Sequence, residues 1–131
     1  MGKRILTVDD DIDILEVYSL ILVAEGYEVK TLLSPSRLAE TIVEFVPDLI
    51  ILDIQLDHCN NGLELCLQLK MSELTRHIPI FIVSSHESIH TAKYQFLAND
   101  IVMKPFDLAV LTNKINDCLL AGAIPFRKAS A

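Results

Sequence analysis

Five polar residues come directly after short apolar runs, at positions from which they could act together. They are Asp9, Asp10, Asp53, Ser84 and Lys104. Ionised carboxylates about 5 Å apart repel one another by roughly 3 kcal/mol per pair at an effective dielectric constant of about 20. A cation is therefore needed if the three aspartates share a pocket, and Mg²⁺ prefers such an all-oxygen, partly hydrated site. Carboxylates that hold a metal, an ammonium and a hydroxyl are the groups that phosphoryl transfer requires, because positioning and charge neutralisation dominate that reaction.

These residues can meet only if the apolar runs are strands of one sheet. Short apolar runs alternate with longer amphipathic segments along the chain, which is the sequence pattern of a βαβ fold. We therefore predict an α/β, flavodoxin-like fold with five helices, in which a doubly wound, five-stranded parallel sheet has the order 2-1-3-4-5. The expected strands are residues 4–8, 27–32, 48–52, 78–83 and 100–103, and the expected helices are residues 14–26, 35–46, 62–71, 87–98 and 107–121.

The predicted strand order brings the polar residues to one edge of the sheet. Ligands of a doubly wound sheet bind outside the carboxyl ends of its strands. The first, third, fourth and fifth strands are neighbours in this order, so the three aspartates, the serine and the lysine would surround one pocket. Asp53 ends the central strand, which makes it the natural nucleophile. Each residue alone has an ordinary explanation as a helix cap, a turn residue or a solvated charge, and only their joint placement favours a reactive site.

The composition indicates one domain. A chain of 131 residues with 51% hydrophobic residues can bury a core without disulfides or a structural metal. Lys and Arg number 11 against 18 Asp and Glu, a formal net charge of −7, which argues against nucleic-acid binding by this domain. We expect no membrane span, no zinc or disulfide framework and a cytoplasmic location, because apolar stretches are short and the three cysteines form no CxxC pair. Residues 3–121 are the expected domain, and residues 122–131 are the expected tail or start of a linker.

Four motifs resemble those of one known family. They are Val-Asp-Asp-Asp at 8–11, Leu-Ile-Ile-Leu-Asp at 49–53, Ile-Val-Ser-Ser at 82–85 and Met-Lys-Pro-Phe at 103–106. In this order they look like the receiver domain of two-component response regulators, of the chemotaxis-regulator kind. The resemblance covers about residues 3–121, which is nearly the whole chain.

The resemblance implies a role for each acidic residue. Asp53 matches the phosphoacceptor, which takes a phosphoryl group from a sensor histidine kinase or a phosphotransfer protein. Asp9 and Asp10 match the acidic pair, and the Mg²⁺ site would consist of Asp9, Asp10, Asp53 and the backbone carbonyl of Gln55. The domain would then be a signalling phosphoacceptor that assists only its own phosphorylation and dephosphorylation, rather than an enzyme.

The resemblance also implies how the signal is read out. Ser84 matches the switch hydroxyl and Lys104 the site lysine, and both would move toward a phosphoryl group on Asp53. These motions would repack the face formed by the fourth helix, the fifth strand and the fifth helix. That face would contact a downstream output domain or protein, or form a homodimer.

Three departures from the family pattern concern this readout. The loop 54–62 has one extra residue and carries Asp57 where the family usually has proline. Position 101, usually aromatic, is Ile101, so the usual aromatic switch partner of Ser84 is absent. Leu97 stands where glycine is common. None of these positions belongs to the acidic pocket, so they affect the readout more than phosphorylation itself.

Three other functions fit part of the pattern. A degenerate receiver would act as a docking module without phosphorylation, and the absence of an aromatic residue at position 101 is compatible with it. A haloacid-dehalogenase-type phosphatase also uses an aspartate nucleophile with Mg²⁺, but its second aspartate would stand where this chain has Gln55, and the chain has no room for a substrate cap. A flavodoxin-like FMN carrier shares the sheet order, but its phosphate loop is rich in Ser, Thr and Gly, whereas residues 9–11 are all Asp.

Overall fold

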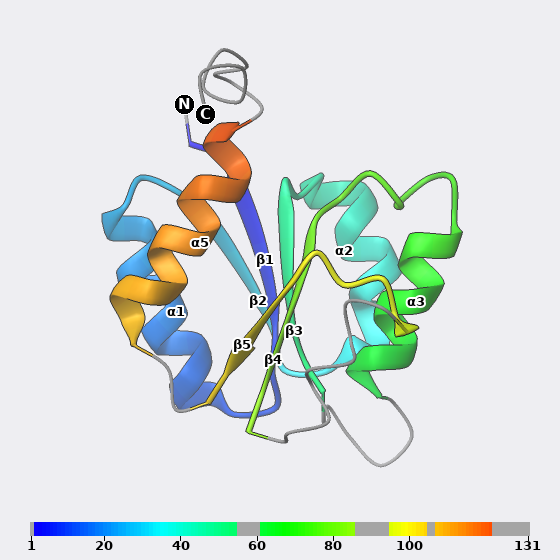
Figure 1. Ribbon diagram of the computed structural model, residues 1–131, viewed down its shortest axis with the longest axis horizontal. Coiled ribbons are helices and arrows are strands. Elements are labelled where there is room, and N and C mark those ends of the chain that lie inside the picture. Colours follow the sequence, from blue (N-terminus) through cyan, green and yellow to red (C-terminus); the bar gives the residue numbers. More distant parts are fainter. Residues whose placement is uncertain (1, 55–60, 86–94, 105–106, 122–131) are drawn as a thin grey trace.

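Five short strands form one parallel sheet in the order β2-β1-β3-β4-β5, as predicted. The structure, a computed structural model, describes residues 2–54, 61–85, 95–104 and 107–121. The strands are β1 (Arg4–Val8), β2 (Glu28–Leu32), β3 (Leu49–Asp53), β4 (Ile80–Ser84) and β5 (Asp100–Met103) (Figure 1).

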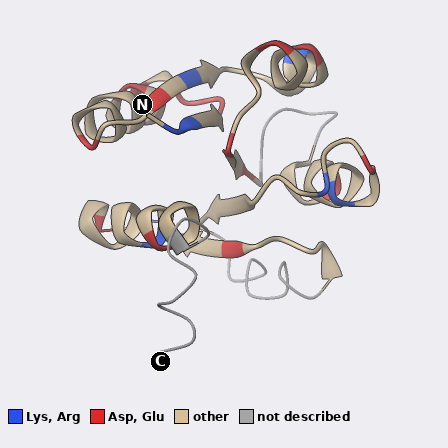
Figure 2. Ribbon diagram, turned by 90° about the horizontal axis from the view of Figure 1, so that it is seen from above, with Lys and Arg blue, Asp and Glu red and all other residues tan. Residues whose placement is uncertain are grey.

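Helices cover both faces of the sheet. Helices α1 (Ile12–Ala24) and α5 (Leu108–Ala121) lie on one face, and α2 (Leu38–Phe45) and α3 (Gly62–Met71) lie on the other. Figure 2, which looks along the strands, shows the sheet between these layers and shows acidic and basic residues on both. Four of the five expected helices thus lie in the described part, and the helix predicted for 87–98 falls largely on residues outside it. Within the described residues, no helix has the length and apolar character needed to cross a bilayer.

Each face of the sheet has its own core, because side chains alternate between the two faces of a strand. Ile5, Ile51 and Val102 belong to the cluster shared with α1 and α5, whereas Leu6 and Leu52 belong to the cluster shared with α2 and α3. All five residues of β3, in the middle of the sheet, are buried. Burial of one Ile or Leu side chain stabilises the fold by about 1.5–3 kcal/mol. The two clusters therefore hold the strand ends in fixed positions.

Most element boundaries differ by one to three residues from the sequence-based expectation, and the beginnings of α2 and β4 differ for local reasons. Pro35–Arg37 form a 3₁₀ turn, η1, before α2 begins, and the Ser34 side chain accepts a hydrogen bond from the backbone of Ser36 in that turn. Strand β4 begins at Ile80 rather than at residue 78, since Pro79 has no N–H to donate to a neighbouring strand.

Leu97 has a left-handed backbone with φ of 63°. Residues other than glycine adopt this region rarely, because the Cβ atom approaches the carbonyl oxygen. The receiver-domain pattern described above commonly has glycine at this position, and the observed conformation explains that preference, because glycine adopts a left-handed backbone without strain.

The two ends of the described chain lie far from the carboxyl ends of the strands. Strand β1 begins and α5 ends at the same edge of the sheet (Figure 1). The strands run from that edge to the opposite one, where Asp9 and Asp53 are located.

Candidate functional site

Three carboxylates meet at the carboxyl edge of the sheet. One carboxylate oxygen each of Asp9, Asp10 and Asp53 lies within 4.8 Å of the other two. Asp9 and Asp53 are buried, with 1% and 9% of their surface exposed, whereas Asp10 is exposed. The three aspartates that the sequence analysis singles out therefore lie together at this edge of the sheet.

The turn between β1 and α1 holds Asp9 in place. The backbone N–H of Asp9 donates to the carbonyl of Leu32 at 3.1 Å, and the Asp9 carboxylate accepts from the backbone of Asp11 at 3.0 Å. Asp11 in turn caps α1, because its carboxylate accepts from the backbone of Asp13 at 2.9 Å. A capping hydrogen bond of this kind contributes about 1 kcal/mol. Within this acidic run, Asp9 and Asp10 thus contribute to the carboxylate cluster, and Asp11 caps the helix.

Lys104 supplies the positive charge of the pocket. Its Nζ lies 3.2 Å from Oδ2 of Asp9 and 3.6 Å from Oδ1 of Asp53. The end of β4 positions this lysine, since the backbone of Lys104 donates to the carbonyl of Ser84 at 2.8 Å. Ser84 itself is 3% exposed and stands opposite Met103 in the register of β4 and β5. The hydroxyl and the ammonium therefore come from neighbouring strand ends, as the sequence predicts.

Burial raises the pKa of both inner carboxyl groups. The pKa of Asp53 is raised to about 6, mainly because burial disfavours its charged form, and the charge of Asp9 adds to this effect while Lys104 opposes it. The pKa of Asp9 is also raised by burial, against the hydrogen bond from Asp11 and the charge of Lys104. One ammonium cannot neutralise three carboxylates, so the pocket retains excess negative charge at neutral pH.

The donors present fit a hard divalent cation. Mg²⁺ takes oxygen ligands and usually keeps several waters, and the three clustered donors are all carboxylate oxygens, one of them on an exposed residue. Receiver domains hold Mg²⁺ in an acidic pocket of this kind. The fourth predicted ligand, Gln55, lies outside the described residues.

Sequence reasoning did not single out the buried Tyr18 or the close approach of Gly62 to Asp53. Tyr18 of α1 is 2% exposed, and the charges of both Asp9 and Asp53 act on its phenol. Gly62, the first residue of α3, approaches β3 so closely that a Cβ atom there would overlap the carbonyl oxygen of Asp53. In the sequence, Tyr18 is one aromatic residue on an apolar helix face and Gly62 one glycine at the start of a helix, so neither pattern points to the site.

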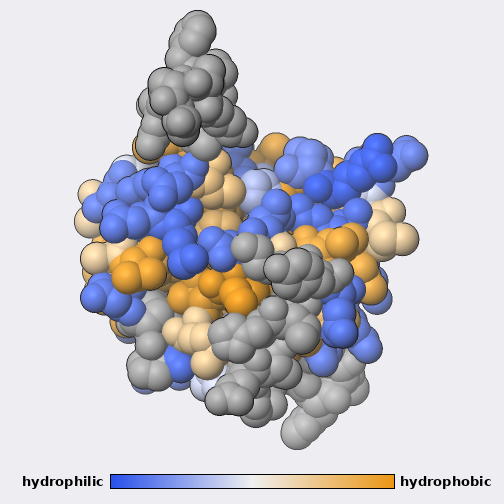
Figure 3. Space-filling view, in the orientation of Figure 1, coloured by the Kyte–Doolittle hydropathy of each residue, from blue (hydrophilic) through white to orange (hydrophobic). Residues whose placement is uncertain are grey.

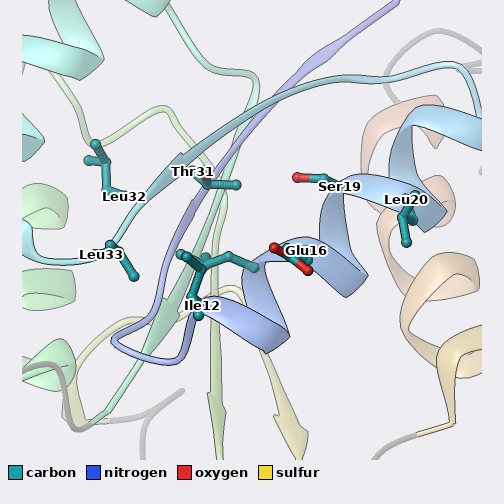
Figure 4. A pocket seen from close by; sticks show the side chains of 8 residues that line it. Ile12, Glu16, Ser19, Leu20, Thr31, Leu32 and Leu33 are labelled. Carbon is teal, nitrogen blue, oxygen red and sulfur yellow. The ribbon is translucent and has the colours of Figure 1, made fainter.

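A separate hollow of about 540 Å³ lies beside the pocket, between α1 and β2. Figure 4 shows the apolar side chains of Ile12, Leu20 and Leu33 around this hollow. The polar side chains of Glu16 and Ser19, like Ile12 and Leu20, come from α1. The three apolar side chains are exposed. Because Ile12 begins α1 just after the acidic run, this hollow adjoins the edge of the sheet that carries Asp53.

The family is established by comparison with known proteins. The family model described as the response regulator receiver domain matches residues 5–116. The chain therefore belongs to the response regulator receiver domain family. Membership makes it a signalling domain of two-component systems rather than a classical enzyme, and it supports a role in phosphorylation-based signalling.

Individual relatives agree with this assignment. The phosphate regulon transcriptional regulatory protein PhoB of Pseudomonas aeruginosa is 34% identical over 121 residues, which are 91% of this chain and 52% of that protein. A putative response regulator from Chloroflexus aurantiacus has a similar structure, with a TM-score of 0.84, 30% identity and coverage of 91% and 98% of the two chains. The BeF3-activated receiver domain of DrrB has a TM-score of 0.77 at 26% identity, with the same coverage. The chain spans about half the length of curated relatives such as PhoB.

Proposed function

We propose that Asp53 accepts a phosphoryl group from a histidine kinase or a phosphotransfer protein, with Mg²⁺ held by Asp9, Asp10 and Asp53. The observation that carries this proposal is the clustering of the three carboxylates within 4.8 Å, with the ammonium of Lys104 at two of them. Family membership supports it. The backbone carbonyl of Gln55 is proposed as a further Mg²⁺ ligand.

The residues have separate tasks in the transfer. With a pKa of about 6, the Asp53 carboxyl group is ionised at neutral pH and can attack. One of its oxygens forms a bond to phosphorus while the bond between phosphorus and the imidazole nitrogen of the donor breaks, and the electron pair stays on that nitrogen. Bound Mg²⁺ would neutralise charge on the phosphoryl oxygens. The ammonium of Lys104, 3.6 Å from Oδ1 of Asp53, would neutralise part of the same charge.

The donor protein needs a surface beside Asp53. The hollow between α1 and β2 offers exposed apolar side chains next to the pocket (Figure 4). We propose that the histidine-bearing partner binds there, because its imidazole must reach the carboxyl edge of the sheet. Curated relatives are response regulators, which implies kinases and output domains as partners.

The signal is proposed to leave through β5 and α5, together with the helix predicted for 87–98. Ser84 ends β4 and Lys104 directly follows β5, so their movement toward a phosphoryl group would displace these elements. Figure 3 shows hydrophobic side chains gathered on this face in the region of β5, and Leu108 and Val110 of α5 are exposed. This face would contact an output domain or protein, or a second copy of the chain.

Phosphorylation by a small donor tests the proposal. Wild-type protein incubated with acetyl phosphate should gain one phosphoryl group by intact-mass spectrometry when Mg²⁺ is present, and none with a chelator. Asp53→Asn should gain none, since its amide is no nucleophile. Asp13→Asn, which neutralises an exposed carboxylate of α1 outside the pocket, is the matched control and should behave as wild type.

Two outcomes would overturn the proposal. Labelling of Asp53→Asn at the wild-type rate would remove Asp53 as the acceptor. A wild-type protein that no donor labels would instead be a degenerate receiver that acts as a docking module.

A further inference from the structure

Asp11 joins the acidic pocket to the start of α1. Its backbone N–H donates to Oδ1 of Asp9 at 3.0 Å, and its carbonyl accepts from the backbone of Leu15 in the helix at 3.2 Å. Its carboxylate accepts from the backbone of Asp13 at 2.9 Å. Asp11 is exposed, and the carboxylate cluster is formed by other aspartates. Its contact with the pocket is therefore made by its N–H.

The side chain of Asp11 determines where this N–H points. The backbone of Asp11 is extended, with φ of −100° and ψ of 109°, and the helix begins at the next residue. An N-cap residue holds such a non-helical conformation because its side chain accepts from an N–H of the first turn. Loss of that acceptor would release the backbone of residue 11. The direction of the N–H that contacts Asp9 would then no longer be fixed.

Two donors orient the Asp9 carboxylate, one at each of its oxygens. The N–H of Asp11 contacts Oδ1, and the ammonium of Lys104 lies 3.2 Å from Oδ2. The same ammonium lies 3.6 Å from Oδ1 of Asp53. Lys104 is thus shared between Asp9 and the proposed phosphoacceptor, whereas the N–H of Asp11 contacts Asp9 from the backbone of the turn.

Phosphorylation would change these two contacts unequally. A phosphoryl group on Asp53 adds negative charge and acceptor oxygens, so it would draw the Lys104 ammonium toward itself. Asp9 would then lose part of its contact with Lys104. The N–H of Asp11 belongs to the backbone of a capped helix and stays in place. It would therefore continue to orient Asp9 when the phosphoryl group is present.

We propose that Asp11 is a positioning residue of the phosphoacceptor site, whose helix cap fixes the backbone N–H that orients Asp9 in the Mg²⁺ site. This rests on the proposed phosphorylation of Asp53 with Mg²⁺. Asp11 touches neither the metal nor the phosphoryl group in this proposal, and its charge is not required. An uncharged side chain that caps α1 equally well should therefore replace it.

Two substitutions of Asp11 separate the cap from the charge. Asp11→Asn removes the charge and keeps a side chain that caps as well as Asp, whereas Asp11→Ala removes both. Beryllium fluoride with Mg²⁺ serves as the phosphoryl mimic, and calorimetry measures its binding. Asp11→Ala should bind it about three- to tenfold more weakly than Asp11→Asn, which is the range of a typical intramolecular hydrogen bond.

A spectroscopic measurement follows the N–H itself. The amide proton of residue 11 lies in a hydrogen bond to a carboxylate oxygen, and such bonds are stronger than those to neutral acceptors. In nuclear magnetic resonance spectra this proton should resonate downfield in wild type and in Asp11→Asn. It should move upfield in Asp11→Ala, because its direction is no longer fixed.

Asp107 provides the matched control, because it caps α5 in the same way. Its carboxylate accepts from the backbone of Ala109 at 2.7 Å, its carbonyl accepts from Leu111 at 3.1 Å, and it is exposed. Asp107→Ala should melt lower than Asp107→Asn, by about as much as the melting temperatures of the two Asp11 variants differ. The two Asp107 variants should bind beryllium fluoride within a factor of two of each other.

The outcomes separate this proposal from the proposed function. If wild type is phosphorylated and the two Asp11 variants bind beryllium fluoride within a factor of two of each other, the role of Asp11 is overturned alone. An equal difference between the two Asp107 variants would also overturn it, since the effect would then be a general loss of helix stability. If wild type takes up no phosphoryl group, the proposed function fails and this proposal fails with it.

Discussion

At the residue scale, Asp53 occupies a place where its ionised form is disfavoured in the absence of a divalent cation. Its side chain is 12% exposed, it shares the pocket with Asp9, and its pKa is raised to about 6. A folded state that binds the proton of Asp53 more tightly than the unfolded chain gains stability at low pH.

The stability of the metal-free protein should therefore fall as Asp53 ionises. This residue's contribution is fully present below about pH 4, the ordinary pKa of Asp, and is lost as pH rises through about 6. The loss is on the order of 2–3 kcal/mol. Urea unfolding in a chelator, from about pH 4 to about pH 7, should show Asp53→Asn gaining stability relative to wild type across this window. A difference between the two proteins that does not change with pH would contradict the raised pKa.

The sequence predicts which charged residues lie together at the carboxyl edge of the sheet better than it predicts their environment. Asp9, Asp10, Asp53 and Lys104 could be found because each follows an apolar run, and the carboxyl ends of neighbouring strands must meet. Tyr18 could not, because one phenol on an apolar helix face looks like any core residue. The pKa of Asp53 depends on burial by residues that are distant in the chain, so it follows from the structure alone.

At the element scale, the contact between β3 and α3 sets the position of Asp53, the proposed phosphoacceptor. The backbone of Gly62 donates to the carbonyl of Ile54 at 2.7 Å, and α3 begins against the carbonyl of Asp53. Asn61 caps this helix by accepting from the backbone of Leu63 at 2.8 Å. The start of α3 therefore braces the end of β3.

Gly62→Ala should displace the end of β3 and slow phosphorylation. The added methyl group has no room beside the backbone of Asp53, so we expect about 2 kcal/mol or more of lost stability and at least a tenfold slower reaction with acetyl phosphate. Gly26→Ala is the control, because its φ of 97° makes alanine strained while nothing lies within 4 Å of the added atom. It should lose about 1 kcal/mol and react as wild type. Equal reaction rates in the two variants would show that the brace has no role at Asp53.

The order and type of the described elements could be predicted because their hydrophobic periods differ. Buried strands such as β3 are continuous apolar runs, whereas helices repeat their apolar residues every three or four positions. The start of β4 and the turn η1 could not be predicted in detail, since hydrogen bonding around Pro79 and Ser34 decides them. The close approach of Gly62 to Asp53 also depends on how α3 packs against the sheet.

At the scale of the whole molecule, the proposed Mg²⁺ site would couple metal binding to folding. Carboxylates that repel one another destabilise the folded state, and a cation bound only by that state reverses the effect. A ligand at a hundredfold excess over its dissociation constant stabilises by about 2.7 kcal/mol.

Mg²⁺ should raise the melting temperature by about 5–10 °C under that condition. Asp10→Asn should melt higher than wild type without metal, because one repelling charge is gone, and should gain less from Mg²⁺. Sodium chloride at matched ionic strength controls for screening, and differential scanning calorimetry measures both effects. A melting temperature that does not respond to Mg²⁺ would favour the docking module without phosphorylation.

The position of the last described helix has a mechanical consequence. Helix α5 ends at the edge of the sheet where β1 begins (Figure 1), and β3 ends with Asp53 at the other edge. A domain joined to the chain at Ala121 would lie about one strand length, roughly 17 Å, from the edge of the sheet that carries Asp53. A domain attached there would leave the approach to Asp53 open. A reaction at Asp53 could reach it only through displacement of α5 along the helix axis.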